Sequence, residues 1–480
     1  MGSPSRAVLA RRRRAISEPS LPGALFWAFA GLLMLAPLPF GMVHEAVQAL
    51  FACLVLTLVC LTALPRALAP AGAPSGDPPA VSLRTIAPEA AAFCLVFLWA
   101  GFQLLPLSPE AWRHPLWAEA GEALGRDLPG AIHLAPGAGW AALLRLATYG
   151  AVFWLALQWG RDRARARRLL GAVVLAAALY ALYGLAVQFA DVRSVLWVGK
   201  TRYVEDVTGV FVNRNSFATY LGLALLWGGA YYLHLVYRAL ESGREGRDRT
   251  VFLVQQLLVR AAPHLAALLI LLTALLLTHS RAGTVAALAS LVLLALLYGP
   301  VQRISRAGRL LSGGTLAVAA AAVLLLSGAA VLQRLAATDL EREQRLQVYE
   351  RVAQAVEGAP WTGHGHGSFA QAYPLYADRG SAHWDKAHND WLEAIFELGR
   401  PAAFLWFAVL AGLGLRCLIA VFRRRRDRLY PAAAFCACVL VGLHSAVDFS
   451  LQIPAVAVTF AALLGVGTAQ SRSSGETAGP

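Results

Sequence analysis

The polar residues best suited to chemistry gather between Gly363 and Asp390. The run Gly363-His-Gly-His-Gly-Ser-Phe369 is followed by two tyrosines and then by His388, Asn389 and Asp390, just before a long apolar stretch. A histidine can act as a general base near neutral pH. Asn389 or Asp390 can cap the helix that follows. His388 is therefore the candidate catalytic residue.

Two other interpretations of these histidines stay open. His388 could simply occupy the membrane interface beside Trp384 and Trp391, where aromatic residues are enriched. His364, His366 and His383 could bind a metal ion, but the glycines around the first two favour a tight turn. We expect no metal and no cofactor.

Two further polar segments adjoin apolar runs. Phe211-Val-Asn213-Arg214-Asn215 precedes one run, and Thr278-His-Ser-Arg281-Ala-Gly283 lies in a sharp turn between two others. An arginine at the edge of a membrane span is a functional candidate, although the Arg281 side chain could instead extend toward lipid headgroups. Asp448, at the end of another run, is expected to cap a helix or to pair with an arginine.

Long apolar stretches must position these residues. The 480 residues are 58% hydrophobic and only 15% charged, and about 20 apolar residues suffice for one helix to cross a bilayer. The sequence predicts an all-α polytopic membrane protein with about twelve transmembrane helices and one large extracytoplasmic helical loop. The predicted spans lie near 22–41, 45–64, 87–107, 140–159, 169–190, 216–237, 263–279, 282–299, 313–332, 394–421, 430–447 and 454–469.

Blocks of arginine predict the orientation of these spans. Arginine is concentrated at 11–14, 161–168, 238–260, 303–309 and 423–428, and cytoplasmic segments carry the excess of Lys and Arg. Both ends are therefore expected in the cytoplasm, with the polar segments outside. The predicted parts are a cytoplasmic basic N-terminus (1–21), helices 1–9 (22–332), an extracytoplasmic loop domain (333–387), helices 10–12 (388–469) and a cytoplasmic tail (470–480).

The loop domain is the one sizeable polar piece of the sequence. Apolar residues recur at helical spacing after Thr338 and predict an amphipathic helix, which the Gly358-Ala-Pro sequence should end. The apolar positions of this helix are Leu346, Tyr349, Val352 and Val356.

Several classes of protein are excluded. The formal net charge of +14 comes from arginine blocks beside apolar runs, which topology explains better than nucleic-acid binding. The cytoplasmic loops contain no phosphate-cradling Gly-Lys-Ser/Thr loop, so an ATP-driven pump is not expected. The six cysteines lie in apolar stretches without the spacing of a disulfide framework or a metal site.

Taken together, these segments resemble the O-antigen ligase and polymerase superfamily of membrane glycosyltransferases over most of residues 200–460. The ligases show a His followed by Asn, Ser or Gln, nine residues, a Gly, two residues, and a Gly, Thr or Tyr. His388, Asn389 and Gly399 match this pattern, and Ala402 departs from it. Further similar signatures are Phe-x-Asn-x-Asn-x-x-Ala at 211–218, Ser-Arg-Ala-Gly at 280–283 and Gly-x-Gly-x-Gly-x-Phe at 363–369.

The resemblance implies transfer of a glycan from undecaprenyl diphosphate to an acceptor hydroxyl, on the periplasmic side of the membrane and without a metal. The acceptor would be a glycan, lipid or protein, as in the synthesis of lipopolysaccharide and other polysaccharides of the cell envelope. His388 would be the general base. Arg281 and Arg345 would bind the diphosphate, and the substrate-positioning residues would be Asn213, Asn215, Asn389, Gly363 and Gly365.

Two alternative functions remain. A protein O-oligosaccharyltransferase would use the same donor with a Ser or Thr acceptor. A transporter of small solutes or inorganic ions should place polar groups near the middle of the bilayer. Ionisable residues inside the predicted spans are few, mainly Arg145, His234 and Arg416.

Overall fold

The computed structural model describes residues 21–68, 81–240, 251–252, 255–298, 339–377, 384–424 and 427–472. Over these ranges nearly all regular structure is helical. The strands described are a two-residue antiparallel pair, β1 (Ser194–Val195) and β2 (Val198–Gly199). The predicted all-α class is confirmed.

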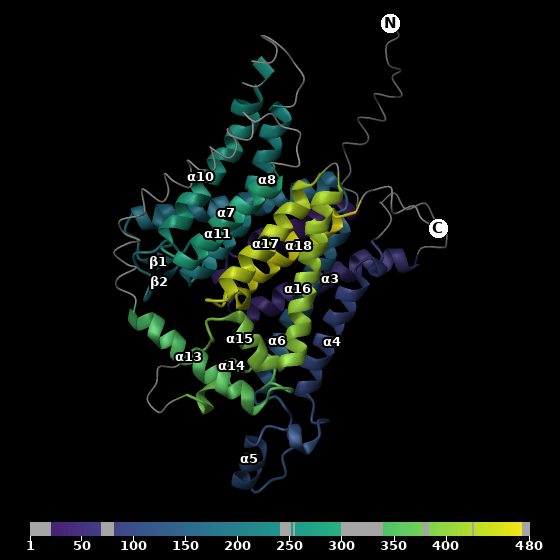
Figure 1. Ribbon diagram of the computed structural model, residues 1–480, viewed down its shortest axis with the longest axis vertical. Coiled ribbons are helices and arrows are strands. Elements are labelled where there is room, and N and C mark those ends of the chain that lie inside the picture. The colour runs from purple at the N-terminus through teal and green to yellow at the C-terminus, as the bar shows by residue number, and fades with distance from the viewer. Residues whose placement is uncertain are drawn as a thin grey trace.

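Long apolar helices form the body of the protein, and shorter helices join them (Figure 1). The helices of the body are α2 (Leu21–Leu35), α3 (Glu45–Leu68), α4 (Ala87–Leu104), α6 (Pro136–Trp159), α7 (Arg163–Phe189), α8 (Arg214–Leu240), α10 (Ala262–Leu277), α11 (Arg281–Tyr298), α16 (Arg400–Arg423), α17 (Leu429–Ser445) and α18 (Pro454–Ala469). The shorter helices are α5 (Leu116–Leu124), α13 (Asp339–Gly358), α14 (Phe369–Ala372) and α15 (Asp390–Leu398). Single turns of 3-10 helix lie at Phe40–Met42, Leu83–Ile86, Glu110–Trp112, Tyr373–Leu375 and Ser450–Gln452, and a π-helix lies at Gln255–Ala261.

Within the described residues, seven helical segments are long and apolar enough to cross a membrane. They are Glu45–Leu64, Leu83–Leu104, Pro136–Trp159, Arg163–Phe189, Val259–Leu277, Arg281–Tyr298 and Arg400–Arg423. Gly23–Leu35, Leu429–Ser445 and Pro454–Ala469 are apolar but shorter. The predicted span at 313–332 and residues 1–20 lie outside the described residues. The chain is therefore a multi-pass membrane protein, and the count of twelve stays a prediction.

Helix α18 is buried along almost its whole length and fixes the segment that precedes it. It packs against α6, α16 and α17, and small residues allow the close approach. A Cβ added at Gly465 would collide with the backbone of α6 at Phe153, and one at Gly467 would collide with Ala434 of α17. The loop at 446–453, just before α18, is therefore held in place from both sides.

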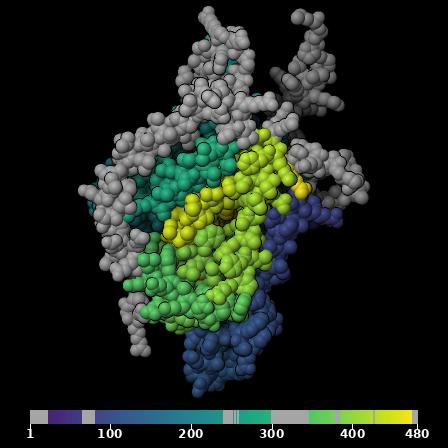
Figure 2. All heavy atoms as spheres, viewed as in Figure 1, coloured from purple at the N-terminus to yellow at the C-terminus, as the bar shows by residue number. Residues whose placement is uncertain are grey.

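The loop helices gather at one end of the bundle. Helices α13, α14 and α15 lie together there, with α5 beyond them (Figure 1). Figure 2 shows α13, α14 and α15, in green, lying against α16 in yellow-green, with α5 in blue. The amphipathic helix predicted after Thr338 is confirmed as α13. Its buried side chains are Val348, Val352, Ala355 and Val356, which pack with Phe369, Tyr373 and Phe396.

Two details of the prediction for this region are wrong. Leu346 is 51% exposed, and the buried residue of that turn is Val348. The predicted span at 394–421 is not one continuous helix, because α15 ends at Leu398, Gly399 follows it, and α16 begins at Arg400. Gly399 has φ +76, and a Cβ there would collide with the Trp361 carbonyl. The loop at 361–363 packs so closely against residue 399 that this position must be a glycine in a non-helical conformation. The helix is therefore broken between α15 and α16.

Shortening a side chain on the buried face of α13 should loosen the loop helices. Val352 is fully buried, so Val352→Ala should cost about 2 kcal/mol of unfolding free energy and lower the thermal midpoint of the detergent-solubilised protein. Leu346→Ala, on the exposed face, is the matched control and should leave the midpoint within about 1 °C. Equal midpoints for the two variants would contradict this packing.

Candidate active site

His388 is held rigidly in front of α15. Its backbone has φ 54, a conformation that is unfavourable for a residue with a Cβ and is often found at functional sites. Asn389 caps the helix by accepting the Leu392 N–H at 3.0 Å, as predicted. The rings of Trp384 and Phe449 meet the imidazole edge-on, with centroids 5.2 Å and 4.7 Å away.

A buried carboxylate faces the imidazole. Asp448 is 1% exposed, and its Oδ1 lies 3.9 Å from His388 Nδ1. Its Oδ1 accepts a hydrogen bond from the Asn215 amide at 3.0 Å, and its Oδ2 accepts one from the Ser450 hydroxyl at 2.7 Å. The expectation that Asp448 caps a helix or pairs with an arginine is replaced by these partners: a histidine, an amide and a hydroxyl.

Asn213, just before α8, and Asn215, in its first turn, have different roles. Asn213 Oδ1 accepts the backbone N–H groups of Asn215 and Ser216 at 2.7 Å and 3.3 Å, so it caps α8. Only Asn215 reaches Asp448 with its side chain. Asn215 therefore binds the Asp448 carboxylate that faces His388, whereas Asn213 lies two residues earlier and caps α8.

Asp206 is a second buried carboxylate near this end of α8, and the sequence did not single it out. Arg214 donates to its Oδ2 at 2.7 Å, and His279 Nδ1 lies 2.6 Å from its Oδ1. Burial acts to raise the pKa of Asp206, but the hydrogen bonds and charges of His279 and Arg214 outweigh it and hold that pKa below its usual value. Lys200 Nζ donates to the Asp206 carbonyl at 2.9 Å.

Arg281 opens α11 and is half-buried. The first turn of α11 packs tightly, because a Cβ added at Gly283 would lie 2.8 Å from Ala218 Cβ and 3.2 Å from the His444 ring. The His444 ring lies 2.6 Å from the Thr219 hydroxyl, which donates to Ser450 at 2.8 Å. The start of α11 thus belongs to the same polar neighbourhood as Asp448.

Helix α13 reaches this neighbourhood through two side chains one turn apart. Arg345 donates to the Val447 carbonyl at 3.2 Å, beside Asp448. The Tyr349 hydroxyl donates to the His388 carbonyl at 2.8 Å. Helix α13 therefore brings Arg345 beside Asp448, and binding of a diphosphate by Arg345 stays a prediction.

The glycine-rich loop at 363–369 packs against the end of α15, the helix that follows His388. Gly363, Gly365 and Gly367 have φ of +66, +103 and +85, values that favour glycine. A Cβ at Gly363 would collide with the backbone at 397–399, and one at Gly365 would collide with the His133 ring. These glycines therefore allow close backbone packing, and a direct substrate contact by Gly363 or Gly365 stays a prediction.

The loop histidines point to separate partners. The His364 ring is 3% exposed, lies 4.4 Å from the Phe396 ring and has Nε2 3.2 Å from the Ala355 carbonyl. His366 Nδ1 lies 3.1 Å from Glu397 Oε2. His383 lies outside the described residues. Within the described ranges, groups of three or more His, Cys, Asp or Glu that could hold a metal ion are not found.

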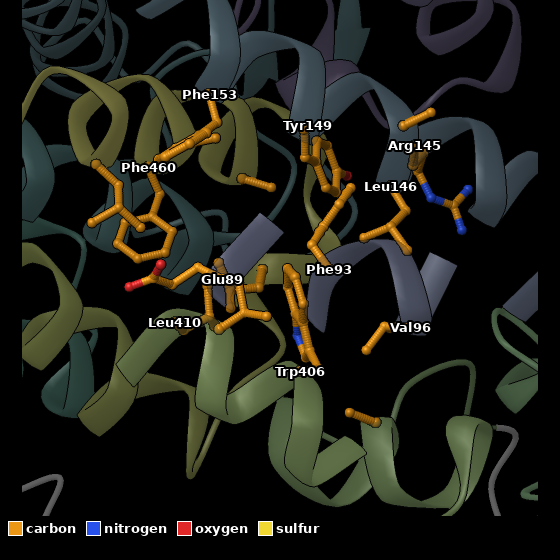
Figure 3. A pocket seen from close by; sticks show the side chains of 18 of the residues that line it. Glu89, Phe93, Val96, Arg145, Leu146, Tyr149, Phe153, Trp406, Leu410 and Phe460 are labelled. Atoms are coloured by element: carbon orange, nitrogen blue, oxygen red, sulfur yellow. The ribbon is translucent and has the colours of Figure 1, made fainter. Parts of the chain in front are cut away.

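A cavity of 440 Å³, lined by residues of α4, α6, α15, α16 and α18, borders the site (Figure 3). Asp390 lines this cavity, and its backbone N–H donates to the Asp448 carbonyl at 3.2 Å. Asp390 Oδ2 accepts the Ser445 hydroxyl at 2.7 Å and the Leu451 N–H at 3.1 Å. Burial raises the pKa of the Asp390 carboxyl well above its usual value, despite these two hydrogen bonds.

The fold and the site define a multi-pass helical membrane protein with one polar site covered by loop helices. Residues 266–407 match the family model described as O-Antigen ligase, from α10 to the first turns of α16. This match includes Arg281, Arg345 and His388. This segment is therefore similar to the O-antigen ligase family, and the resemblance predicted from its motifs is confirmed. No curated protein matches the chain.

The buried His364 should make the loop domain sensitive to acid. Burial lowers the pKa of His364 to about 4, against about 6.5 in an unfolded chain. The unfolded chain therefore takes up this proton first. The stabilisation is fully present above about pH 6.5 and falls by up to about 3 kcal/mol as the pH drops toward 4.

Thermal midpoints measured from about pH 7 to about pH 4.5 test this effect. His364→Phe should flatten the fall in midpoint relative to the wild type, because the ring then carries no titrating group. His44→Phe, at an exposed position, is the matched control and should keep the wild-type slope. An unchanged slope in His364→Phe would show that another group governs the acid sensitivity.

Proposed function

We propose that this protein transfers a glycan from an undecaprenyl-diphosphate carrier to an acceptor hydroxyl, in the synthesis of cell-surface polysaccharide such as lipopolysaccharide. The reaction takes place at the periplasmic face of the bacterial inner membrane. The observation that carries the proposal is the imidazole of His388 facing the buried carboxylate of Asp448 at 3.9 Å, in a chain whose residues 266–407 match the O-antigen ligase family model.

His388 acts as the general base. It takes the proton of the acceptor hydroxyl while the acceptor oxygen bonds to the anomeric carbon and the bond from that carbon to the diphosphate breaks. Asp448 stabilises the imidazolium that forms, as a carboxylate does beside a catalytic histidine. The separation of 3.9 Å exceeds a hydrogen bond, and such contacts shorten when substrate binds.

Arg281 and Arg345 stabilise the leaving diphosphate. Negative charge grows on that group in the transition state, and preplaced guanidinium groups favour it. Arg345 uses one of its five N–H donors for the Val447 carbonyl, which leaves donors to bind phosphate oxygens. Two arginines supply the positive charge, so the proposed reaction uses no metal ion.

Asn215 and Asn389 position the reacting groups indirectly. Asn215 holds Asp448 through its amide. Asn389 fixes the backbone that follows His388 by capping α15. Asn213 in turn fixes the start of α8, on which Asn215 lies. The proposed positioning of substrate by these residues thus works through the orientation of the base.

Removing the base should abolish transfer without unfolding the protein. In proteoliposomes with undecaprenyl-diphosphate-linked glycan and acceptor, His388→Ala should lower the transfer rate by about 10²–10⁴-fold. Both the variant and the wild type should insert equally, and EDTA should not change the wild-type rate. Retained transfer by His388→Ala would exclude the base assignment, and inhibition by EDTA would exclude the metal-free mechanism.

Removing the Arg345 guanidinium should weaken catalysis more than folding. Arg345→Gln should lower the rate of transfer by about 10²-fold while thermal stability changes by less than about 1 kcal/mol. Arg351→Gln makes the same charge change six residues further along α13 and serves as the matched control. Equal rates for the two variants would show that the position of Arg345 has no special role.

A further inference from the structure

An apolar slot runs between four helices of the body. It is the 440 Å³ cavity bordering the site, and α4, α6, α16 and α18 form its walls. Figure 3 shows aromatic and aliphatic side chains around it, among them Phe93, Trp406, Leu410 and Phe460. Among the described residues, helices α11 and α13, which carry Arg281 and Arg345, contribute nothing to the lining. The slot is therefore separate from the proposed diphosphate site.

The dimensions of the slot suit a hydrocarbon chain. Its lining follows α6 from Ala142 to Trp154, and twelve residues of helix rise about 18 Å. Half of a bilayer's hydrocarbon core is about 15 Å thick. Three of its walls are helices long and apolar enough to span a membrane, so the molecules able to enter between them are lipids.

Arg145 lines the slot and forms no ion pair with any described residue. Arg145 donates to Gln48 Oε1 at 3.2 Å, and within the described residues no carboxylate pairs with it. By contrast, Glu89 at the far end of the slot binds Arg416 through both oxygens, at 2.8 Å and 3.0 Å. Figure 3 shows Arg145 and Glu89 on opposite sides. A charge in apolar surroundings is costly without a counter-ion, so Arg145 favours an anionic ligand.

A second polar residue of the slot has an unsatisfied side-chain oxygen. Asp390 is 6% exposed and lines the slot. Its Oδ1 has no hydrogen-bond partner among the described residues. Arg145, Tyr149 and Asp390 all line the slot. A ligand headgroup that fits them carries an anion for Arg145 and a hydroxyl for Asp390.

We propose that this slot binds one chain of an anionic phospholipid with a hydroxylated headgroup, of the phosphatidylglycerol type. The phosphate lies on Arg145, the headgroup hydroxyl forms a hydrogen bond with Asp390 Oδ1, and the hydrocarbon chain fills the slot toward Glu89. This lipid is distinct from the glycan donor, and the proposal does not depend on glycan transfer. Because Asp390 also adjoins Asp448, the bound lipid would stabilise the wall behind His388.

Native mass spectrometry of the full chain, released from a mild detergent with phosphatidylglycerol added, tests the proposal. We expect one tightly retained phosphatidylglycerol per chain. Arg145→Gln should lower its occupancy by at least about tenfold, since a charge-assisted hydrogen bond is lost. Ala461→Phe should do the same by filling the slot. The matched controls are Arg168→Gln and Leu179→Phe, at exposed positions of α7.

Four outcomes support or contradict the proposed binding of phosphatidylglycerol in the slot. Loss of the lipid in both slot variants, with retention in both controls, supports the proposal. Retention in Ala461→Phe would overturn it even if Arg145→Gln failed to fold. Equal retention of phosphatidylcholine would overturn the charge recognition. Displacement of phosphatidylglycerol by an equal concentration of undecaprenyl phosphate would assign the slot to the donor lipid instead.

Discussion

The site depends on the burial of one carboxylate, that of Asp448. A buried charge is costly unless hydrogen bonds and opposite charges compensate for it. Here the compensation comes from Asn215 on α8, from Ser450 just before α18 and from the facing imidazole of His388. The interactions that compensate the buried charge of Asp448 thus join the start of α8, the loop before α18 and the residue before Asn389.

The surrounding packing keeps these segments from moving apart. Small residues on α18 let it approach α6 and α17 closely, which fixes the loop that bears Asp448. The glycine-rich loop and the break at Gly399 let the backbone at 361–367 lie against the end of α15. Helix α13 is attached to these segments by hydrogen bonds that Arg345 and Tyr349 donate to backbone carbonyls. The strained backbone of His388 is tolerated because all of these contacts restrain it.

Local features of the site could be predicted from the sequence, and long-range ones could not. The cap at Asn389, the turn before Arg281 and the helix after Thr338 follow from residue types and spacing alone. The pairing of Asn215 with Asp448 joins residues 233 positions apart, which no local pattern encodes. Asp206 was missed for the same reason, because its partner His279 lies 73 positions away. Val348 replaced Leu346 in the core because tertiary packing decided which face of α13 is buried.

The central claim is that His388 and Asp448 act as one unit, and a double-mutant cycle on the rate of glycan transfer tests it most directly. The rates of His388→Ala, Asp448→Asn and the double variant would be measured in proteoliposomes with the lipid-linked donor. If the carboxylate works through the imidazole, the double variant is no slower than His388→Ala alone. Rate losses that multiply in the double variant would show that the two residues act independently, which would contradict the account.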